Sequence, residues 1–315
     1  MQISEKSIRA GLAALLCALG MGVSQWVASP QVTAFLIYLY TGRNARSFVE
    51  CPQLAVRFAE SAPAAPRPTL AVVPTQPEPE AVEVTYACDV KPDIPALLEK
   101  PISLGEAPAV LILSTHSTES YTRAGEDYAE SANYRTLDPE YNMVSIGSYV
   151  AERLQAQGIQ VFQDTEFHDY PSYNGSYAHA RKSIRSYLKE HPNIGIILDL
   201  HRDAAASGSG QMRTHAQVDG QDSAQLMLVM GTDAGGLDHA DWEENLALAL
   251  KLHVKLEALA PGITRPLSLR AQRFNQDLSA GAMLIEVGAA GNTRAEALRA
   301  AEVLAQAVGA LLSGA

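Results

Sequence analysis

The stretch Ala109–Tyr121, AVLILSTHSTESY, decides how the rest of the chain is interpreted. Its first five residues are all apolar, include the β-branched Val110 and Ile112, and lack helical spacing. Such a run predicts a strand buried on both faces, as in the centre of a parallel sheet. Small polar residues follow, with His116 and Glu119 three positions apart. A histidine and a carboxylate that leave a buried strand together can hold one divalent metal ion, although a surface turn explains this pair equally well.

Strand and helix patterns alternate along the chain from Gly105 onward. Short apolar runs predict further strands, and apolar residues at helical spacing predict helices between them. The strands are expected at Ile159–Phe162, Ile194–Leu200, Leu226–Met230 and Ala282–Val287. The helices are expected at Asn142–Gln157, Tyr177–Glu190, Trp242–Ala260 and Thr293–Leu312. This order predicts an α/β fold with a single mixed or mostly parallel sheet and helices on both faces.

The amino-terminal segment favours a membrane anchor. Lys6 and Arg9 precede the stretch Ala10–Gly42, which contains no acidic or basic residue. Its first part is long enough to cross a bilayer, which takes about 20 residues. The positive charges before it predict a single-pass anchor, with the amino terminus inside and the rest on the extracytoplasmic side. A cleaved signal peptide is the alternative, although Trp26 and Pro30 suit a cleavage site poorly.

Proline marks the next boundary. The stretch Ala62–Glu80 contains six prolines, which block helices and sheet ladders and predict an extended linker. We therefore divide the chain into an anchor region (1–42), a Pro-rich linker and lead-in (43–104) and a folded domain (105–315). Cys51 and Cys88 fall on the outer side of the expected anchor, where a disulfide can form, and their pairing stays open. The net charge of −11 leaves no basic stripe for nucleic acid, so we expect no nucleic-acid partner.

Two further strands are predicted to end in residues that carry chemistry. The run IGIILDL leads directly into His201, Arg202 and Asp203, and the run AMLIEV contains Glu286 near its end. The carboxyl ends of strands in open α/β sheets are where ligands bind, so we expect these side chains to meet the first histidine–carboxylate pair. A buried glutamate is costly unless it is used, which favours a chemical role for Glu286 over pairing with an arginine.

Together these residues match the ligand chemistry of a hydrolytic zinc site. Catalytic zinc commonly takes two histidines and one carboxylate and leaves one position for water. His116, Glu119 and His201 fit that set. Zinc lowers the pKa of its water and polarises a carbonyl, and a nearby carboxylate such as Glu286 can carry the proton to a leaving amine. The pattern therefore indicates Zn²⁺ as the cofactor and hydrolysis as the reaction.

Four blocks of the sequence resemble the stage II sporulation protein P family. In the family's order, they are THSTESY, HDYPSYNGSY, LDLHRDA and RFNQDLSAGAMLIEVGAAGNT. The resemblance implies a zinc amidase fold, related to the zinc carboxypeptidases. It also implies a membrane-anchored, zinc-dependent peptidoglycan hydrolase of the N-acetylmuramoyl-L-alanine amidase type, active during engulfment of the forespore in sporulation. Partners implied by the resemblance include stage II sporulation protein D and stage II sporulation protein M.

The resemblance also carries over to single residues. His116 and His201 match the family's ligand histidines, and Glu286 matches its catalytic glutamate. Two residues compete to be the third ligand. Glu119 follows a carboxypeptidase-like His-x-x-Glu pattern, whereas Glu140 stands just before a predicted helix, where the wider amidase group places its ligand. We expect Glu119, with Glu140 as its rival.

Other residues of the four blocks are expected to bind substrate. They are Tyr170, Tyr173, Asn174, Arg202, Asp203 and Asn275. The first three belong to the polar, aromatic loop His168–Tyr177, which predicts a lip that holds sugar or peptide, although a self-packed loop explains it equally well. Arg202 and Asp203 are expected to hold a substrate carboxylate or to orient His201, and Asn275 to hydrogen-bond the peptide.

The sequence as a whole predicts an amidase that cuts peptidoglycan between the lactyl group of N-acetylmuramic acid and L-alanine. A zinc endopeptidase that cuts the stem peptide or cross-link is one alternative, because some family members are credited with that activity. A membrane-tethered, wall-binding scaffold without turnover is another, and the complete ligand set argues against it.

Overall fold

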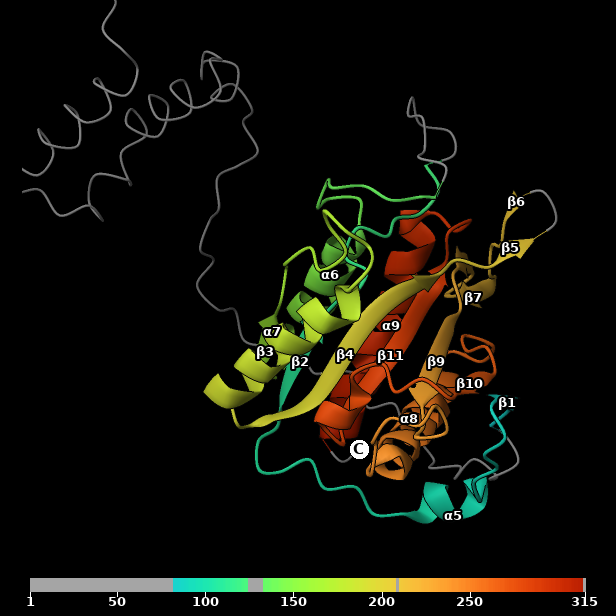
Figure 1. Ribbon diagram of the computed structural model, residues 1–315. Coiled ribbons are helices and arrows are strands. Elements are labelled where there is room, and N and C mark those ends of the chain that lie inside the picture. Colours follow the sequence, from blue (N-terminus) through green and yellow to red (C-terminus); the bar gives the residue numbers. More distant parts are fainter. Residues whose placement is uncertain (1–81, 124–132, 208–209, 314–315) are drawn as a thin grey trace, which may run out of the picture. The chain divides into compact units, whose positions relative to one another are not determined.

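The computed structural model describes residues 82–123, 133–207 and 210–313 (Figure 1). The main sheet has seven strands in the order β1-β10-β9-β11-β4-β2-β3. These strands are β1 (Val84–Ala87), β2 (Ala109–Leu113), β3 (Val161–Gln163), β4 (Ile194–Asp203), β9 (Leu226–Gly231), β10 (Leu267–Arg270) and β11 (Ala282–Ala289). The helices are α5 (Ile94–Glu99), α6 (Met143–Ala156), α7 (Ser176–Glu190), α8 (Trp242–Leu259), α9 (Arg294–Leu312) and the short 3₁₀ helix η2 (Gln276–Leu278). Two small hairpins pair β5 (Ala206–Ser207) with β6 (Gly210–Gln211) and β7 (Ala216–Val218) with β8 (Gln221–Ser223).

The main sheet is mixed, as the sequence predicts. Its neighbouring strands run parallel, except that β9 and β11 are antiparallel. Every residue of β2 is at most 1% exposed, which is the burial that an unbroken apolar run predicts. The expected α/β class, with one mixed sheet and helices on both faces, is therefore confirmed.

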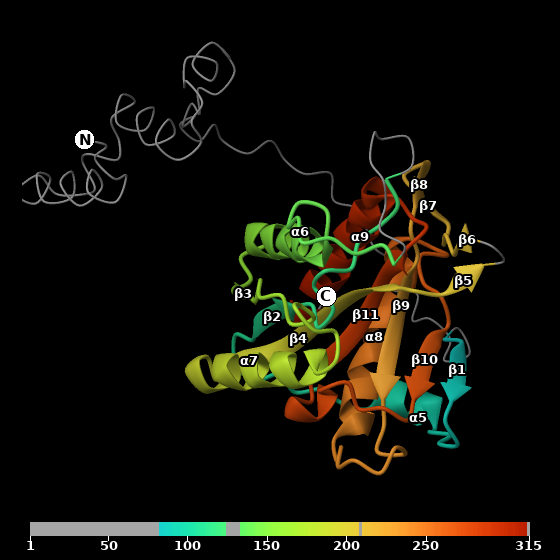
Figure 2. The same cartoon turned by 45° about the horizontal axis from the view of Figure 1, so that its top comes forward.

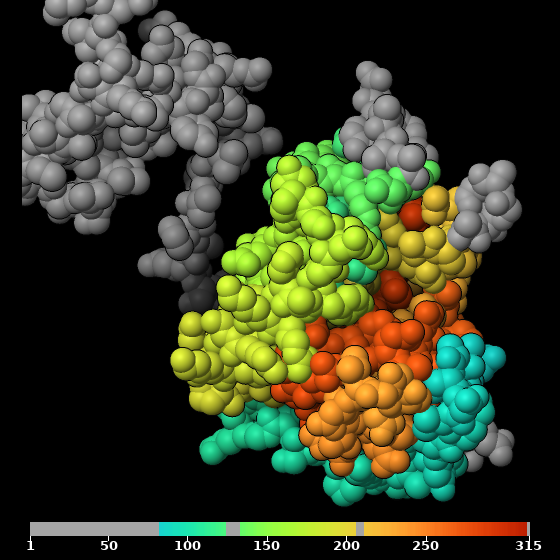
Figure 3. Space-filling view, viewed as in Figure 1, coloured from blue at the N-terminus to red at the C-terminus, as the bar shows by residue number. Residues whose placement is uncertain are grey.

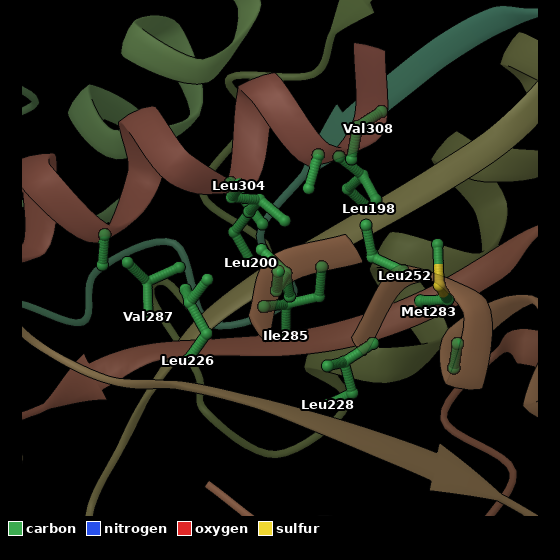
Figure 4. Packing of buried hydrophobic residues seen from close by; sticks show 14 of the residues in the cluster. Leu198, Leu200, Leu226, Leu228, Leu252, Met283, Ile285, Val287, Leu304 and Val308 are labelled. Carbon is green, nitrogen blue, oxygen red and sulfur yellow. The ribbon is translucent and has the colours of Figure 1, made fainter. Parts of the chain in front are cut away.

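The two faces of the sheet differ in their cover. Helices α6, α8 and α9 pack on one face, where their side chains join those of the central strands in the main core. Leu198, Ile285 and Leu304 belong to this cluster and lie close together in Figure 4. Helix α7 packs on the opposite face of β2 and β4 through Ala180 and Ile184 (Figure 2). Each large side chain that is fully buried in such a core contributes about 1.5–3 kcal/mol.

Local sequence signals set the starts of two long helices. The side chain of Asn142 accepts a hydrogen bond from the backbone N–H of Val144 and caps α6. Thr293 and Glu296 form a capping box at the start of α9. Both helices therefore begin where the capping residues predict.

The folded part begins earlier than the boundary expected near Gly105. Strand β1 pairs with β10 along its whole length, and Leu97 of α5 is buried. The lead-in from Val82 onward is therefore part of the fold, which corrects the expected division. Strands β1 and β10 were not predicted, because each has only four residues and their pairing partners, more than their own patterns, decide their conformation.

The expected anchor at residues 1–42 lies outside the described residues, as does Cys51. Among the described helices, none combines the length and the apolar character that crossing a bilayer requires. Cys88 is half-buried, and its thiol lies 3.8 Å from the carbonyl oxygen of Leu269. Its pairing with Cys51 stays a prediction.

Candidate metal centre

The site begins where the apolar pattern of two central strands breaks. On the face that α7 covers, β4 presents Ile197, then Asp199 and His201, and β11 presents Leu284 and then Glu286. These strands are parallel neighbours, and their register pairs Glu286 with His201. Because successive side chains of a strand alternate between faces, the paired residues point to the same side. The carboxyl ends of β4 and β11 thus bring an acid and an imidazole together.

The turn after β2 completes the group. The backbone N–H of Glu119 donates to the carbonyl oxygen of His116 at 3.0 Å and closes this turn. His116 Nδ1 lies 3.5 Å from Glu119 Oε1, and His201 Nδ1 lies 3.6 Å from Glu119 Oε2. The two imidazole rings meet edge-on, with centroids 4.9 Å apart. Ligand atoms of all three side chains lie within 4.8 Å of one another, so small side-chain rotations suffice to bring them onto one ion.

Glu119 is buried, and its neighbours hold it as a carboxylate. Arg135 Nη2 donates to its Oε1 at 3.2 Å, and the backbone N–H of Arg202 donates to its Oε2 at 3.2 Å. Burial alone would raise the pKa of Glu119, but its contacts with His116 and His201 and the charge of Arg202 outweigh burial and hold that pKa well below its ordinary value. The centre of the group therefore carries a negative charge.

Asp199 supports His201 from the same strand. Its carboxylate accepts hydrogen bonds from the backbone N–H and the hydroxyl of Thr115, each at 2.7 Å. Its Oδ1 lies 2.9 Å from His201 Nε2, without the alignment of a hydrogen bond. Burial lowers the pKa of His201, but the charge of Asp199 and the contact with Glu119 outweigh it and raise that pKa well above its ordinary value. Carboxylates placed in this way orient ligand histidines at metal sites.

Glu286 stands beside the group without a partner. Its Oε2 atom is buried and has no hydrogen-bond partner among the described residues. Burial raises the pKa of Glu286 to about 8, with the charge of His201 opposing the shift and that of Glu119 adding to it. Glu286 as a whole is half-buried, but an acid with a buried, unpaired oxygen is costly, and perturbed acids of this kind gather at functional sites.

Two tyrosines of the expected lip flank His116. The ring of Tyr173 stacks on His116 at a centroid distance of 4.7 Å, and the ring of Tyr177 meets it edge-on at 5.6 Å. Tyr173 is 53% exposed, and the guanidinium of Arg135 lies 4.8 Å from the centre of its ring. Both tyrosines therefore border the metal centre, and Tyr173 does so from the solvent side.

Two hollows open beside these tyrosines. The Arg-lined groove, of about 500 Å³, has in its lining Tyr177, Arg181, Leu237, Arg273, Phe274 and Asn275. The Tyr-lined hollow, of about 520 Å³, has in its lining Thr118, Asn133, Arg135, Asp169, Tyr170 and Tyr173. In Figure 3 the yellow-green segment with α7 and the orange-red segment after β10, which form the groove, lie against each other. Since Tyr173 and Tyr177 each contact His116, both hollows adjoin the metal centre.

The residues present fit a zinc ion. Two imidazoles and one carboxylate form a common ligand set for catalytic zinc, with bonds of about 2.0–2.2 Å. The buried Glu286 Oε2 atom lacks a hydrogen-bond partner among the described residues, whereas His201 Nε2 faces Asp199 and its Nδ1 faces Glu119. Buried polar atoms are rarely left unpaired, so an orphaned carboxylate oxygen beside the group is what a site completed by an ion and its water would show.

The family model for stage II sporulation protein P matches residues 76–309, well over half of the 315 residues. The chain belongs to the stage II sporulation protein P family. The curated stage II sporulation protein P of Bacillus subtilis (strain 168) is 28% identical over an alignment of 214 residues, which covers 64% of this chain and 50% of the relative. The chain thus spans about half the length of the curated relative that it matches.

Similarity to solved structures is weaker. The N-acetylmuramoyl-L-alanine amidase AmiC2 of Nostoc punctiforme has 14% identity and a TM-score of 0.41, over 66% of this chain and 99% of that chain. The CwlD amidase from Clostridioides difficile, in complex with the GerS lipoprotein, has 13% identity and a TM-score of 0.37, over 64% of this chain and 94% of that chain. The family assignment therefore rests on the sequence match.

Two residues of the family block LDLHRDA make structural contacts. The guanidinium of Arg202 donates to three carbonyl oxygens, those of Ser120, Asn133 and Tyr134. Asp203 Oδ2 accepts a hydrogen bond from Arg265 Nη1 at 2.8 Å. These contacts tie loops to the end of β4, and the expected roles of Arg202 and Asp203 in binding a substrate carboxylate or orienting His201 stay predictions. The backbone N–H of Arg202 donates to Glu119 and so helps to position that residue.

The remaining expected residues divide between the site and its surroundings. Tyr170 is 54% exposed and borders the Tyr-lined hollow, and Asn174 lies in the exposed turn before α7. Asn275 Nδ2 donates to the carbonyl oxygen of Tyr177 at 2.8 Å, so it holds a wall of the groove. Glu140 is exposed and is not part of the histidine–carboxylate group. This placement favours Glu119 over Glu140 as the third ligand.

The sequence reasoning missed the supporting roles of Asp199 and Arg135. A signal for Asp199 was present, because it lies two residues before His201 in an apolar strand and must share a face with it. No signal identified Arg135, since its pairing with Glu119 joins two loops that only the folded chain brings together.

Proposed function

We propose that this chain is a zinc-dependent N-acetylmuramoyl-L-alanine amidase that cuts peptidoglycan during sporulation. One observation carries the proposal: a buried His116–Glu119–His201 group with the unpaired Glu286 beside it, in a chain of this family. The proposal keeps residues 1–42 as a single-pass membrane anchor, with the folded part on the extracytoplasmic side. It also keeps stage II sporulation proteins D and M as partners, as the family resemblance implies.

We assign metal binding and proton transfer to different residues of the site. His116, Glu119 and His201 would hold the ion, with Asp199 and Arg202 fixing the ligands from behind. When bound, zinc would supply a water of lowered pKa and polarise the carbonyl of the scissile amide. Glu286 would accept the proton of that water and pass it to the amine that leaves.

The raised pKa of Glu286 suits this shuttle. A carboxyl group with a pKa of about 8 holds a proton at neutral pH in the metal-free protein. Positive charge close to a carboxyl group lowers its pKa, so a dication at the group would return Glu286 to the range in which it is a base. The same residue could then release the proton to a strongly basic amine.

Digestion of purified peptidoglycan by the full-length protein tests the proposal. An amidase releases free L-alanine amino groups and leaves lactyl carboxyl groups on the sugar, and mass analysis of the fragments identifies both ends. Glu286→Gln should keep zinc bound and lower cleavage by about 10²–10⁴-fold. Glu140→Gln, on the exposed loop, is the matched control and should cleave at the wild-type rate.

The outcomes separate the alternatives. New amino groups inside the stem peptide would support a zinc endopeptidase instead of an amidase. Zinc binding without any cleavage by the wild-type protein would support a wall-binding scaffold. Undiminished cleavage by the Glu286→Gln variant, or by protein stripped of metal with a chelator, would contradict the mechanism.

A further inference from the structure

We infer that the Arg-lined groove binds the acidic stem peptide of the substrate and so sets the direction in which the substrate lies across the metal centre. This inference rests on the proposed function, because it assigns one half of the same substrate to one side of the same site. It adds a specificity determinant, Arg273, which begins one of the four family blocks but is not part of the ligand set.

The groove starts at the metal centre. Tyr177 lies between the two, because its ring is 5.6 Å from that of His116 and 5.9 Å from that of Phe274. Tyr177 and Phe274 are both in the lining of the groove. A chain that leaves the metal centre past Tyr177 therefore enters the groove directly.

The charge in the groove is positive. Its lining contains two arginines and no acidic residue. Arg181 donates two hydrogen bonds, of 2.8 and 2.5 Å, to the carboxylate of Asp277. Arg273 Nη1 donates to the carbonyl oxygen of Asp238 at 3.0 Å and lies 3.4 Å from Asp277. Two guanidinium groups thus share one carboxylate, although the whole chain carries a net charge of −11.

Arg273 is the arginine that can bind a ligand. Within the described part of the chain, both of its contacts engage Nη1, so Nε and Nη2 remain to donate to a ligand. Its side chain is 25% exposed. A guanidinium presents paired N–H groups that match a carboxylate, and a partly desolvated site strengthens that pairing.

The groove is preformed. A Cβ atom at Gly231 in β9 would collide with the carbonyl oxygen of Gln272, and one at Gly235 would lie 2.6 Å from the carbonyl oxygen of Ala271. Phe274 and Asn275, which follow Arg273 in the same loop, have φ values of 52° and 60°. Residues other than glycine rarely adopt this region. Close packing on both glycines fixes this loop, and backbone conformations of this kind often mark ligand sites.

The chemistry of the lining favours peptide over sugar. Leu237 and Phe274 offer apolar contacts, and the arginines offer carboxylate contacts. A stem peptide needs both, because it carries small apolar side chains and free carboxylates. The Tyr-lined hollow differs, since its arginine, Arg135, pairs with Glu119 and Asp169. Its exposed tyrosines lie beside hydroxyl and amide groups, which suit the faces and hydroxyls of a sugar.

Binding of a synthetic stem peptide tests the inference. The probe is the tripeptide L-alanyl-γ-D-glutamyl-meso-diaminopimelate, compared with the same peptide after amidation of its carboxylates, by calorimetry on the full-length protein. Arg273→Gln should weaken binding of the acidic peptide about tenfold, which corresponds to about 1.4 kcal/mol. Binding of the amidated peptide should be weak and unchanged, and Arg273→Lys should recover part of the affinity. Arg153→Gln, on α6 and outside the groove, is the control and should bind as the wild type does.

Three results would show that Arg273 does not bind the carboxylates of the stem peptide. Equal losses for the acidic and the amidated peptide, or no loss with Arg273→Gln, would overturn the inference. So would weaker binding of a neutral N-acetylglucosamine oligomer to this variant, because the groove would then hold sugar. The measurement needs no turnover, so failure of wild-type protein to cleave peptidoglycan would overturn the proposed function and leave this result interpretable. In cleavage assays the same variant should raise KM and leave kcat unchanged.

Discussion

Glu286→Gln should make the free energy of unfolding of the metal-free protein fall less as pH rises. In the folded protein without metal the pKa of Glu286 is raised from 4.5 to about 8. The folded state therefore binds more protons than the unfolded state between these pH values. Wherever that holds, the free energy of unfolding falls as pH rises. Wild-type protein stripped of metal should thus lose stability from about pH 5 to about pH 8, and the glutamine variant should lose less.

The size of the loss in the free energy of unfolding follows from the difference between the two pKa values of Glu286. Each pH unit corresponds to about 1.4 kcal/mol, so the interval from 4.5 to about 8 would correspond to about 5 kcal/mol. The side chain keeps partial exposure, and solvent screening reduces the expected difference to about 2–3 kcal/mol. His201, whose pKa is raised well above 6.5, loses its stabilising contribution in the same direction above pH 6.5. His201 and Glu286 interact electrostatically, so comparison of the variant with wild type removes the part of the His201 contribution that does not depend on Glu286.

Urea unfolding in the presence of a chelator measures the effect. The free energy of unfolding is obtained at about pH 5 and about pH 8 for wild type, Glu286→Gln and Glu140→Gln. Wild type and the Glu140 variant should lose about 2–3 kcal/mol more than the Glu286 variant over this range. Equal losses in all three proteins would show that the pKa of Glu286 is not raised in the folded, metal-free protein.

Three further predictions follow from other parts of the fold. Asp199→Asn should weaken zinc binding about 10–100-fold, because loss of a residue that orients a ligand histidine has this effect. Competition with a chelating dye measures the affinity, and unchanged affinity would show that Asp199 does not orient His201 for zinc binding. Hydrogen bonds from Arg213 and Asn292 outweigh burial and lower the pKa of Glu296 to about 2, so its contribution is present above pH 4.5 and lost as pH falls towards 2. Glu296→Gln should therefore lower the free energy of unfolding by about 1 kcal/mol at pH 7 and by progressively less below pH 4.5. Urea unfolding measures this difference, and a difference that stays constant down to about pH 3 would contradict the prediction. Leu198→Ala, at a fully buried position of the main core, should cost about 2–5 kcal/mol in urea unfolding, and a cost below about 1 kcal/mol would place it outside that core.

The central strands could be predicted because their sequences carry strong patterns. The run Ala109–Leu113 is wholly apolar, and IGIILDL and AMLIEV end in polar residues. Burial on both faces requires such runs, and in this fold the carboxyl ends of the three strands meet at one place. His116, His201 and Glu286 were therefore expected together, and the structure brings them together.

The periphery of the site could not be predicted in the same way. Arg202 follows a site histidine, and a role in binding a substrate carboxylate was expected for it. In the structure its guanidinium holds loop carbonyl groups, a role that the sequence did not indicate, because strand alternation turns its side chain away from that of His201. Strands β1 and β10 depend on each other for pairing, and Arg273 depends on loops that pack on Gly231 and Gly235. Contacts between segments far apart in sequence leave no local pattern.

Anomalous scattering can show whether His116, Glu119 and His201 bind one zinc ion. Crystals of the protein grown with zinc, measured at wavelengths on either side of the zinc absorption edge, give the position of the ion by anomalous scattering. We expect one strong peak bonded to His116, Glu119 and His201 at about 2.0–2.3 Å, with Glu286 beside it but not bonded. A peak elsewhere on the protein, or no peak at these three residues at saturating zinc, would contradict their assignment as the metal ligands.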